Sequence, residues 1–171
     1  MISEFRFPGA KAVLTTARTI APAIAALRKR ASAAGLPVIY VNDMPDDWEA
    51  DQTALVRRCT APGARGCDVA RLLAPRAGDY FLYKPRHSGF YATALAELLY
   101  AAGAHQLIIT GTTTHQCVLF TAMDAYVRGY PVTVPRDCVG APTAAQQRHA
   151  LFVLKNSLRA GTPLSTSLRF G

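Results

Sequence analysis

The feature that most constrains this chain is a cysteine between a buried strand and an amphipathic helix. Residues 107–109 are apolar and predict a strand, and a polar turn over residues 111–116 comes next. From Val118 apolar residues recur at helical spacing until Gly129, a typical helix end. Cys117 is therefore predicted at a helix N-terminus and at the C-terminal end of a strand. There α/β folds present reactive groups and the helix dipole favours a thiolate, which makes Cys117 a candidate nucleophile rather than a buried apolar residue.

Strand and helix patterns alternate along the chain. Pro22 is expected near the first turn of the first helix, where proline is tolerated, and Thr143 with Gln146 fits a capping box for the last. Strands separated by helices predict an α/β fold, a parallel sheet with helices on both faces, in one domain over residues 1–171. Helices are predicted over residues 16–34, 53–58, 68–73, 93–103, 118–128 and 143–160, and strands over residues 36–43, 79–84, 107–109, 131–137 and 164–168.

Composition agrees with one folded domain. Half of the 171 residues are hydrophobic, and no apolar run is long enough to span a membrane. The first residues lack the charged-then-apolar order of a signal peptide, so we expect a cytoplasmic protein without a membrane partner. Cys59 and Cys67 could pair across a Pro-Gly turn, but free thiols are favoured in a reducing cell. No cysteine spacing fits a structural zinc site.

The chain carries a net charge of +8 and a sequence pI of about 9.7, which raises the question of nucleic acid binding. Its basic residues are mostly scattered arginines, and the densest group, residues 28–30, falls on one helical turn. No cluster interleaves aromatic with basic residues, as a single-strand binder would. We therefore expect a solvated basic surface and no nucleic-acid partner.

Three further residues are candidates to act with Cys117. Lys84 ends a predicted strand, and if the strands are parallel it projects from the same sheet edge as Cys117. An ammonium there lowers a thiol pKa and can stabilise an oxyanion, although a surface lysine over the strand end is the alternative. His87 and His115 could form a Cys–His pair or could be plain loop residues.

Two stretches carry a resemblance to a known family. KPRHSGFYAT begins at Lys84, and GTTTHQCVLFTAMDAYVRGYPVTVPRDC contains Cys117 in the pattern G-x-x-T-x-x-C-V-x-x-T-A-x-D-A-x-x-R-G-Y. Over essentially its whole length the chain resembles the isochorismatase-like cysteine hydrolase superfamily, which includes nicotinamidases and carbamoyl-amide hydrolases. The resemblance implies that Lys84 and Cys117 are catalytic and that the peptide bond between Thr112 and Thr113 is cis. It also implies an oxyanion hole formed by the backbone N–H groups of Thr113 and Cys117.

The resemblance departs at the start of the chain. The family ends its first strand with an aspartate that acts as general base, in a run like L-L-V-I-D-M-x-x-D-F, and residues 1–5 match the positions immediately after that aspartate. The family strand order 3-2-1-4-5-6 would put the absent strand mid-sheet, leaving backbone groups unpaired at roughly 1–3 kcal/mol each. Either the true start lies upstream, or the chain is a crippled hydrolase or has another role. Asp43 could approach the pocket.

The resemblance implies hydrolysis of a small amide or related C–N bond through a Cys117 thioester, with a small-molecule substrate. An isochorismatase-type vinyl-ether hydrolase and a non-catalytic family member remain alternatives. No histidine occurs in VNDMPDDWEAD, which argues against a metal-dependent nicotinamidase, and no metal or cofactor is expected. A homo-oligomer is expected by resemblance. Candidate substrate-binding residues are Phe5, Trp48, Phe90 and His115, with ordinary core or lid packing as the alternative for Phe5 and Trp48.

Overall fold

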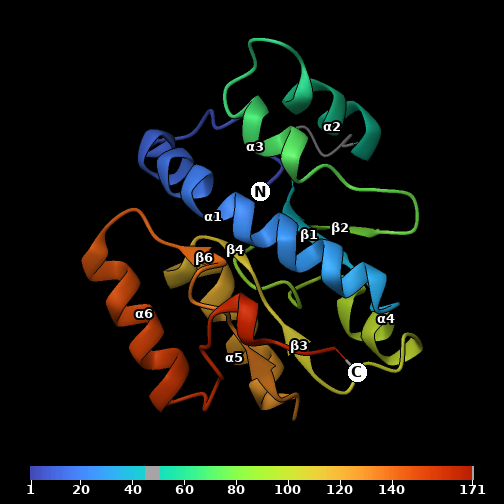
Figure 1. The fold of residues 1–171 in the computed structure, drawn as a ribbon, viewed down its shortest axis with the longest axis vertical. Coiled ribbons are helices and arrows are strands. Elements are labelled where there is room, and N and C mark those ends of the chain that lie inside the picture. Colours follow the sequence, from blue (N-terminus) through green and yellow to red (C-terminus); the bar gives the residue numbers. More distant parts are fainter. Residues whose placement is uncertain (45–50, 171) are drawn as a thin grey trace.

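Parallel strands with helices around them make up the fold (Figure 1), which confirms the predicted α/β class. The computed structural model describes residues 1–44 and 51–170, so Trp48 lies outside the described residues. Figure 1 shows α1 crossing in front of the strands, with α2 and α3 at one end of the molecule and α5 and α6 at the other. The helices are α1 (Ala10–Ala33), α2 (Gln52–Thr60), α3 (Cys67–Leu72), α4 (Leu95–Ala101), α5 (Leu119–Val127) and α6 (Ala144–Asn156), with a π-helical turn η1 (Thr114–Val118) and a 3₁₀ turn η2 (Ser165–Ser167).

The strands form three parallel pairs. They are β1 (Ile39–Asp43), β2 (Tyr80–Lys84), β3 (Leu107–Ile108), β4 (Gly111–Thr112), β5 (Val132–Thr133) and β6 (Val139–Gly140), and the pairs are β1–β2, β3–β5 and β4–β6. Among the described residues no strand joins β1 to β3, which is where the sequence predicted a gap. The residues of β3, and those of β1 up to Asn42, are only half-buried, whereas central strands of a parallel sheet are normally covered on both faces.

Helix α1 begins earlier than the sequence predicted. It starts at Ala10, directly after Gly9, which has a left-handed φ of 79°. Pro22 therefore lies inside the helix rather than in its first turn, and its missing N–H leaves the Arg18 carbonyl without the usual helical donor. The helix continues through this defect because one face is held in the core, with Val13, Ala17, Ile20, Ile24 and Leu27 buried.

The C-terminal elements also differ from prediction. Thr143 caps α6 as expected, since its Oγ1 accepts the Gln146 N–H at 3.2 Å, but the helix ends at Asn156. Gly161 instead pairs beside β5, where its carbonyl accepts the Val134 N–H at 2.7 Å. The strand predicted over residues 164–168 is wrong. The Asp137 carboxylate accepts both the N–H and the hydroxyl of Ser165, at 2.8 and 2.6 Å, and the segment curls into η2.

Helix α5 shows the predicted apolar repeat but not the burial that such a repeat usually indicates. Its small residues Ala122 and Ala125 are fully buried. Its large ones face outward, with exposed fractions of 51% for Phe120 and 65% for Val127.

All four cysteines are free thiols. Within residues 1–44 and 51–170 we find no helix whose length and apolar character would let it cross a membrane.

Candidate active site

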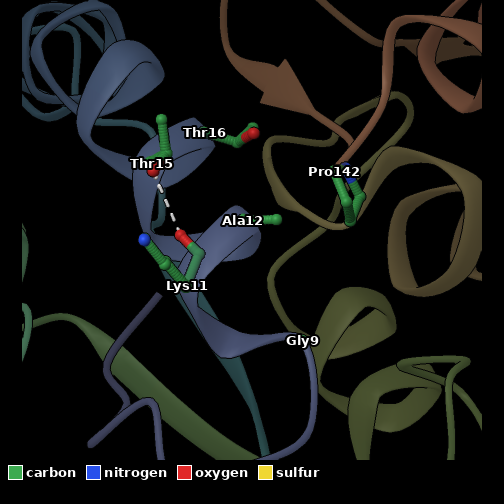
Figure 2. Close-up of a pocket in the computed structure, with 6 residues that line it drawn as sticks. All are labelled: Gly9, Lys11, Ala12, Thr15, Thr16 and Pro142. Atoms are coloured by element: carbon green, nitrogen blue, oxygen red, sulfur yellow. Dashed lines mark hydrogen bonds between the residues drawn. The ribbon is translucent and has the colours of Figure 1, made fainter.

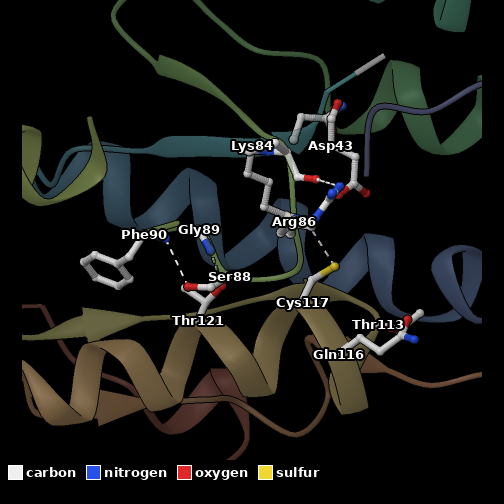
Figure 3. A network of polar contacts seen from close by, with 12 residues as sticks. Asp43, Lys84, Arg86, Ser88, Gly89, Phe90, Thr113, Gln116, Cys117 and Thr121 are labelled. Carbon is white, nitrogen blue, oxygen red and sulfur yellow. Dashed lines mark hydrogen bonds and ion pairs between the residues drawn. The ribbon is translucent and has the colours of Figure 1, made fainter. Parts of the chain in front are cut away.

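Lys84 and Cys117 meet at the carboxyl ends of the strands (Figure 3). Lys84 is the last residue of β2, and Cys117 lies in η1, the turn that leads from β4 into α5. The Lys84 Nζ donates to Cys117 Sγ at 3.3 Å. The Lys84 side chain is only 4% exposed, so it is not a surface lysine, and Cys117 is half-buried. Cys117 thus occupies the first helical turn after a strand, although that turn is π-helical rather than α-helical.

Asp43 supplies a carboxylate to the same ammonium. It is the last residue of β1 and lies opposite Lys84 in the parallel register. The Asp43 carboxylate forms an ion pair with Lys84 Nζ, while the Arg86 carbonyl accepts from the same nitrogen at 3.1 Å. The three Lys84 donors therefore serve Asp43, Arg86 and Cys117. Sequence reasoning expected that Asp43 could approach the pocket, but it did not predict this pairing, which depends on the register of β1 against β2.

These contacts keep Lys84 charged. Burial, the largest single influence, lowers the pKa of Lys84, but the negative charges and hydrogen bonds of Cys117 and Asp43 together raise it above its ordinary value. Lys84 is therefore an ammonium throughout the neutral range. Its positive charge is placed to stabilise negative charge that develops on the Cys117 sulfur. The pair is arranged for nucleophilic chemistry at Cys117.

The turn that carries Cys117 is held from both sides. The peptide bond between Thr112 and Thr113 is cis, and the Thr113 carbonyl accepts the N–H groups of Gln116 and Val118, each at 3.2 Å. Thr114 is fully buried and donates to Gln147 Oε1 of α6 at 2.7 Å. Among the described residues no acceptor is bonded to the Thr113 N–H.

Residue 1 lies at the same site. Thr112 Oγ1 donates to Met1 Sδ at 3.4 Å, and the Met1 amino group is buried within range of the charges of Asp43, Cys117 and Lys84. Burial lowers the pKa of that amino group.

A polar network fixes the segment after Lys84 onto α5 (Figure 3). The Ser88 hydroxyl donates to the Asp124 carboxylate, which also accepts from Arg128 at 2.9 Å. The Gly89 N–H donates to Thr121 Oγ1 at 2.9 Å. These bonds tie the end of β2 to the helix that comes after Cys117. Sequence reasoning did not single out Ser88, Thr121 or Asp124, although all three lie in the two stretches that carry the family resemblance.

Two predicted substrate-binding residues, Phe5 and Phe90, are buried among core side chains. Phe5 is 2% exposed and packs in the cluster formed mainly by α1. Phe90 is 7% exposed, and the Arg128 guanidinium lies 4.7 Å from the centre of its ring. In Figure 3 the Phe90 ring lies away from Cys117. Burial of apolar surface accounts for the position of both rings, and their part in substrate binding stays a prediction.

The two histidines border the site without bonding to Cys117. His115 lies in η1, two residues before Cys117, and its Nδ1 is buried with no partner in the described part of the chain. Burial lowers the pKa of His115, and the charge of nearby His87 lowers it further. The His87 ring centre lies 5.5 Å from that of Phe120. Within residues 1–44 and 51–170 neither histidine forms the Cys–His pair that the sequence left open.

A hollow elsewhere on the molecule is separate from the lysine–cysteine pair. It measures about 470 Å³ and lies between the start of α1 and Pro142 (Figure 2), and none of its lining residues is a predicted site residue.

Among the described residues no three His, Cys, Asp or Glu side chains are grouped to hold a metal ion. Part of the stretch from which the sequence predicted no metal site, residues 45–50, lies outside the described residues.

A parallel α/β fold with a lysine–cysteine pair at the strand ends is the architecture of the isochorismatase-like hydrolases. The chain belongs to this family, because the model of the Isochorismatase domain matches residues 1–167. It is 39% identical over 160 residues to the uncharacterised isochorismatase family protein YaaI of Bacillus subtilis, covering 94% of this chain and 87% of that protein. The chain is a hydrolase of this family.

Other relatives have named activities. The crystal structure of N-carbamoylsarcosine amidase from Thermoplasma acidophilum is similar, with a TM-score of 0.71, 30% identity, and coverage of 90% of this chain and 86% of that one. Maleamate amidohydrolase of Pseudomonas putida is 41% identical over 79 residues. That match covers 46% of this chain and only 36% of the relative, so it compares a part of each protein.

Proposed function

We propose that this chain hydrolyses a small amide or related C–N bond through a thioester on Cys117. The observation that carries the proposal is the 3.3 Å contact between Lys84 Nζ and Cys117 Sγ. A buried ammonium within hydrogen-bond distance of a sulfur is placed to stabilise that sulfur as it attacks a carbonyl carbon. The named activities of the two amide-cleaving relatives support this reaction class.

The proposed reaction begins with the thiol proton. It moves to Lys84 as Lys84 passes a proton to the Asp43 carboxylate, which leaves the Cys117 thiolate beside an ammonium. The thiolate attacks the amide carbonyl, a C–S bond forms, and the oxyanion accepts hydrogen bonds from the Thr113 and Cys117 backbone N–H groups. The C–N bond then breaks, and the leaving nitrogen takes the proton held by the Asp43–Lys84 pair. Water resolves the thioester, releases the acid and returns a proton to sulfur.

We assign the role of proton acceptor to Asp43 because it is the carboxylate bonded to the Lys84 ammonium in the described part of the chain. Its side chain is 76% exposed, so it can exchange protons with solvent. The ion pair of Asp43 with Lys84 supports a catalytic protein over the non-catalytic family member that the sequence left open.

The test is hydrolysis of a small panel of amides by the whole protein. Maleamate, N-carbamoylsarcosine and nicotinamide cover an acid amide, a carbamoyl amine and a neutral aromatic amide. We expect ammonia release from at least one of them, and an acyl adduct on Cys117 in the intact mass after rapid acid quench. Cys117→Ala should abolish both, whereas Cys67→Ala should abolish neither. Ammonia release that survives in Cys117→Ala would rule out covalent catalysis.

We also propose that the chain forms the homo-oligomer expected from the resemblance. The outward apolar side chains of α5 support this, since Phe120, Met123 and Val127 form a stripe at helical spacing and are each at least 45% exposed. Light scattering after size exclusion should give a multiple of the 18.4 kDa chain mass, and Phe120→Lys should lower it. A single species at 18.4 kDa would contradict the proposal.

A further inference from the structure

A threonine of α5 holds the segment that follows Lys84. Thr121 lies four positions after Cys117, a spacing that places helical residues on one face. Figure 3 shows both side chains on the side of the helix that faces this segment. Thr121 Oγ1 accepts the Gly89 N–H at 2.9 Å. The segment is therefore bonded to the helix about one turn away from the sulfur.

The packing around Gly89 leaves little free space at this junction. A Cβ at Gly89 would lie 3.2 Å from Val41 Cγ1 of β1 and from Leu95 Cδ2, and 3.3 Å from Thr121 Cγ2. Such distances are tighter than ordinary van der Waals contact, so the glycine backbone lies directly against its neighbours. Residues 85–89 are thus held between β1 and α5.

Ser88 gives the same segment a second bond to α5. Its hydroxyl donates to the Asp124 carboxylate and accepts the Phe90 N–H at 3.1 Å. Ser88 is buried, so water does not readily compete for these bonds. Asp124 is held in turn by Arg128, which donates to its carboxylate at 2.9 Å. Two side chains of α5 therefore fix the end of the segment 85–89.

The segment 85–89 also carries one of the groups that hold the Lys84 ammonium. The Arg86 carbonyl accepts from Lys84 Nζ at 3.1 Å, and the same nitrogen donates to Cys117 Sγ at 3.3 Å. A hydrogen bond weakens steeply as its distance grows or its angle bends. Because the Arg86 carbonyl lies on a segment bonded to α5, a shift of that segment along the helix would move the ammonium relative to the sulfur.

We propose that Thr121 is a positioning residue for the lysine–cysteine pair, because its bond to the Gly89 N–H sets the separation of Lys84 Nζ from Cys117 Sγ. Thr121 acts through the backbone of residues 85–89 rather than by bonding to the sulfur. This rests on the proposed function, since it names what sets the reactivity of the same sulfur. Its test uses an alkylating reagent, so it is decided even if no amide of the panel is hydrolysed.

Thr121→Val removes the hydroxyl and nearly keeps the shape of the side chain. Iodoacetamide forms a C–S bond with Cys117 and loses iodide, and its rate at pH 7, measured by peptide mass spectrometry, reports how far the ammonium stabilises charge on the sulfur. We expect Thr121→Val to slow this rate about three- to tenfold, the range that one hydrogen bond accounts for. Thr121→Ser retains the hydroxyl and should retain most of the parent rate. No slowing in Thr121→Val, or equal slowing in both variants, would overturn the proposal.

Thr60→Val is the matched control. Thr60 is a half-buried threonine of α2, and its hydroxyl donates to the Val56 carbonyl at 2.8 Å. Figure 1 shows α2 at the end of the molecule away from α5. The Cys117 rate in Thr60→Val should equal that of the parent protein. Slowing as large as in Thr121→Val would point to general loosening of the fold and would also overturn the positioning role.

A double-variant cycle with Lys84→Met tests whether Thr121 acts through the ammonium. In the Lys84→Met background, Thr121→Val should change the Cys117 rate by less than about twofold, because the group that it positions is gone. Equal slowing in both backgrounds would overturn the proposal, since Thr121 would then affect the sulfur without Lys84.

Ser88→Ala repeats the test at the second bond to α5. It should slow the alkylation of Cys117 in the parent background and not in Lys84→Met, and it decides the proposal if urea unfolding shows that Thr121→Val is not folded. Slowing by Ser88→Ala in both backgrounds would overturn the positioning role. If the expected alkylation pattern appears but the parent protein releases no ammonia from any amide, the positioning role is supported and the proposed amide hydrolysis is not.

Discussion

Lys84 Nζ and Cys117 Sγ lie 3.3 Å apart although 33 positions separate the two residues in the sequence. Lys84 ends β2, and Cys117 lies in the turn after β4, so each side chain comes at the carboxyl end of a strand that belongs to a parallel pair. Burial of Lys84 keeps water from screening its ammonium, and Asp43 keeps that ammonium protonated. The reactivity of the sulfur therefore depends on a charge delivered from another strand.

Lys84→Met keeps the length of the side chain and removes its charge. We expect the iodoacetamide alkylation of Cys117 at pH 7 to slow by about tenfold or more, because the thiolate loses its neighbouring ammonium, and amide hydrolysis to be lost. The exposed Lys155→Met on α6 is the matched control and should leave both unchanged. An alkylation rate equal to that of the parent protein would show that Lys84 does not hold the thiolate.

Asp43→Asn removes the ion-pair partner of Lys84. Because Asp43 raises the pKa of Lys84, its neutralisation should lower that pKa, and the ammonium should be lost at a lower pH. The alkaline limb of the pH–rate profile for amide hydrolysis should move to lower pH. Asp43→Glu retains the carboxylate and should retain most of the parent profile. If Asp43→Asn and Asp43→Glu show the same alkaline limb in their pH–rate profiles, the carboxylate of Asp43 does not have the proposed effect on Lys84.

Cys138 should make the protein less stable at alkaline pH. It is fully buried, and burial raises its pKa from 9.0 to about 11. Above pH 9 the unfolded chain ionises this thiol while the folded chain keeps its proton, so the free energy of unfolding falls between pH 9 and about 11. Urea unfolding across this range should show a smaller pH slope for Cys138→Ala than for the parent. Equal slopes would mean that the thiol ionises equally in both states.

Gly140→Ala should destabilise the fold through a local clash. A Cβ at Gly140 would lie 2.0 Å from Thr16 Cγ2 of α1, and neither residue can move freely because Thr16 Oγ1 bonds the Ala141 carbonyl. We expect a loss of about 1–3 kcal/mol in the free energy of unfolding. Thr16→Ser removes the opposing methyl group and should restore part of the lost free energy of unfolding.

Gly161→Ala is the matched control for that clash. Its Cβ would meet Thr133 Oγ1 at an ordinary 3.5 Å, and its φ is not left-handed. Thermal melts of the parent, the two alanine variants and the double variant with Thr16→Ser would separate the effects. Equal melting temperatures for Gly140→Ala and Gly161→Ala would show that β6 and α1 are not packed as described.

The sequence anticipated the elements near the site better than their surroundings. Lys84 and Cys117 could be placed together because both stand at strand ends in a strongly alternating pattern. The pairing of Asp43 with Lys84 could not be predicted from the sequence, because it depends on the register of β1 against β2. The apolar patterns of both strands leave that register open. Phe5 and Phe90 were assigned to the pocket because an aromatic residue near a motif looks the same in sequence whether it faces substrate or core.

The sequence by itself determined the α/β class, the alternation of most helices and strands, and the candidates Lys84 and Cys117, because periodicity and chain order are local properties. Only the tertiary structure decided which apolar faces are covered. Helix α5 buries its alanines and exposes Phe120, and α1 extends through Pro22 because its other contacts outweigh one lost hydrogen bond. Packing between distant segments sets burial and charge pairing, and these in turn give Lys84 and Cys117 their chemical character.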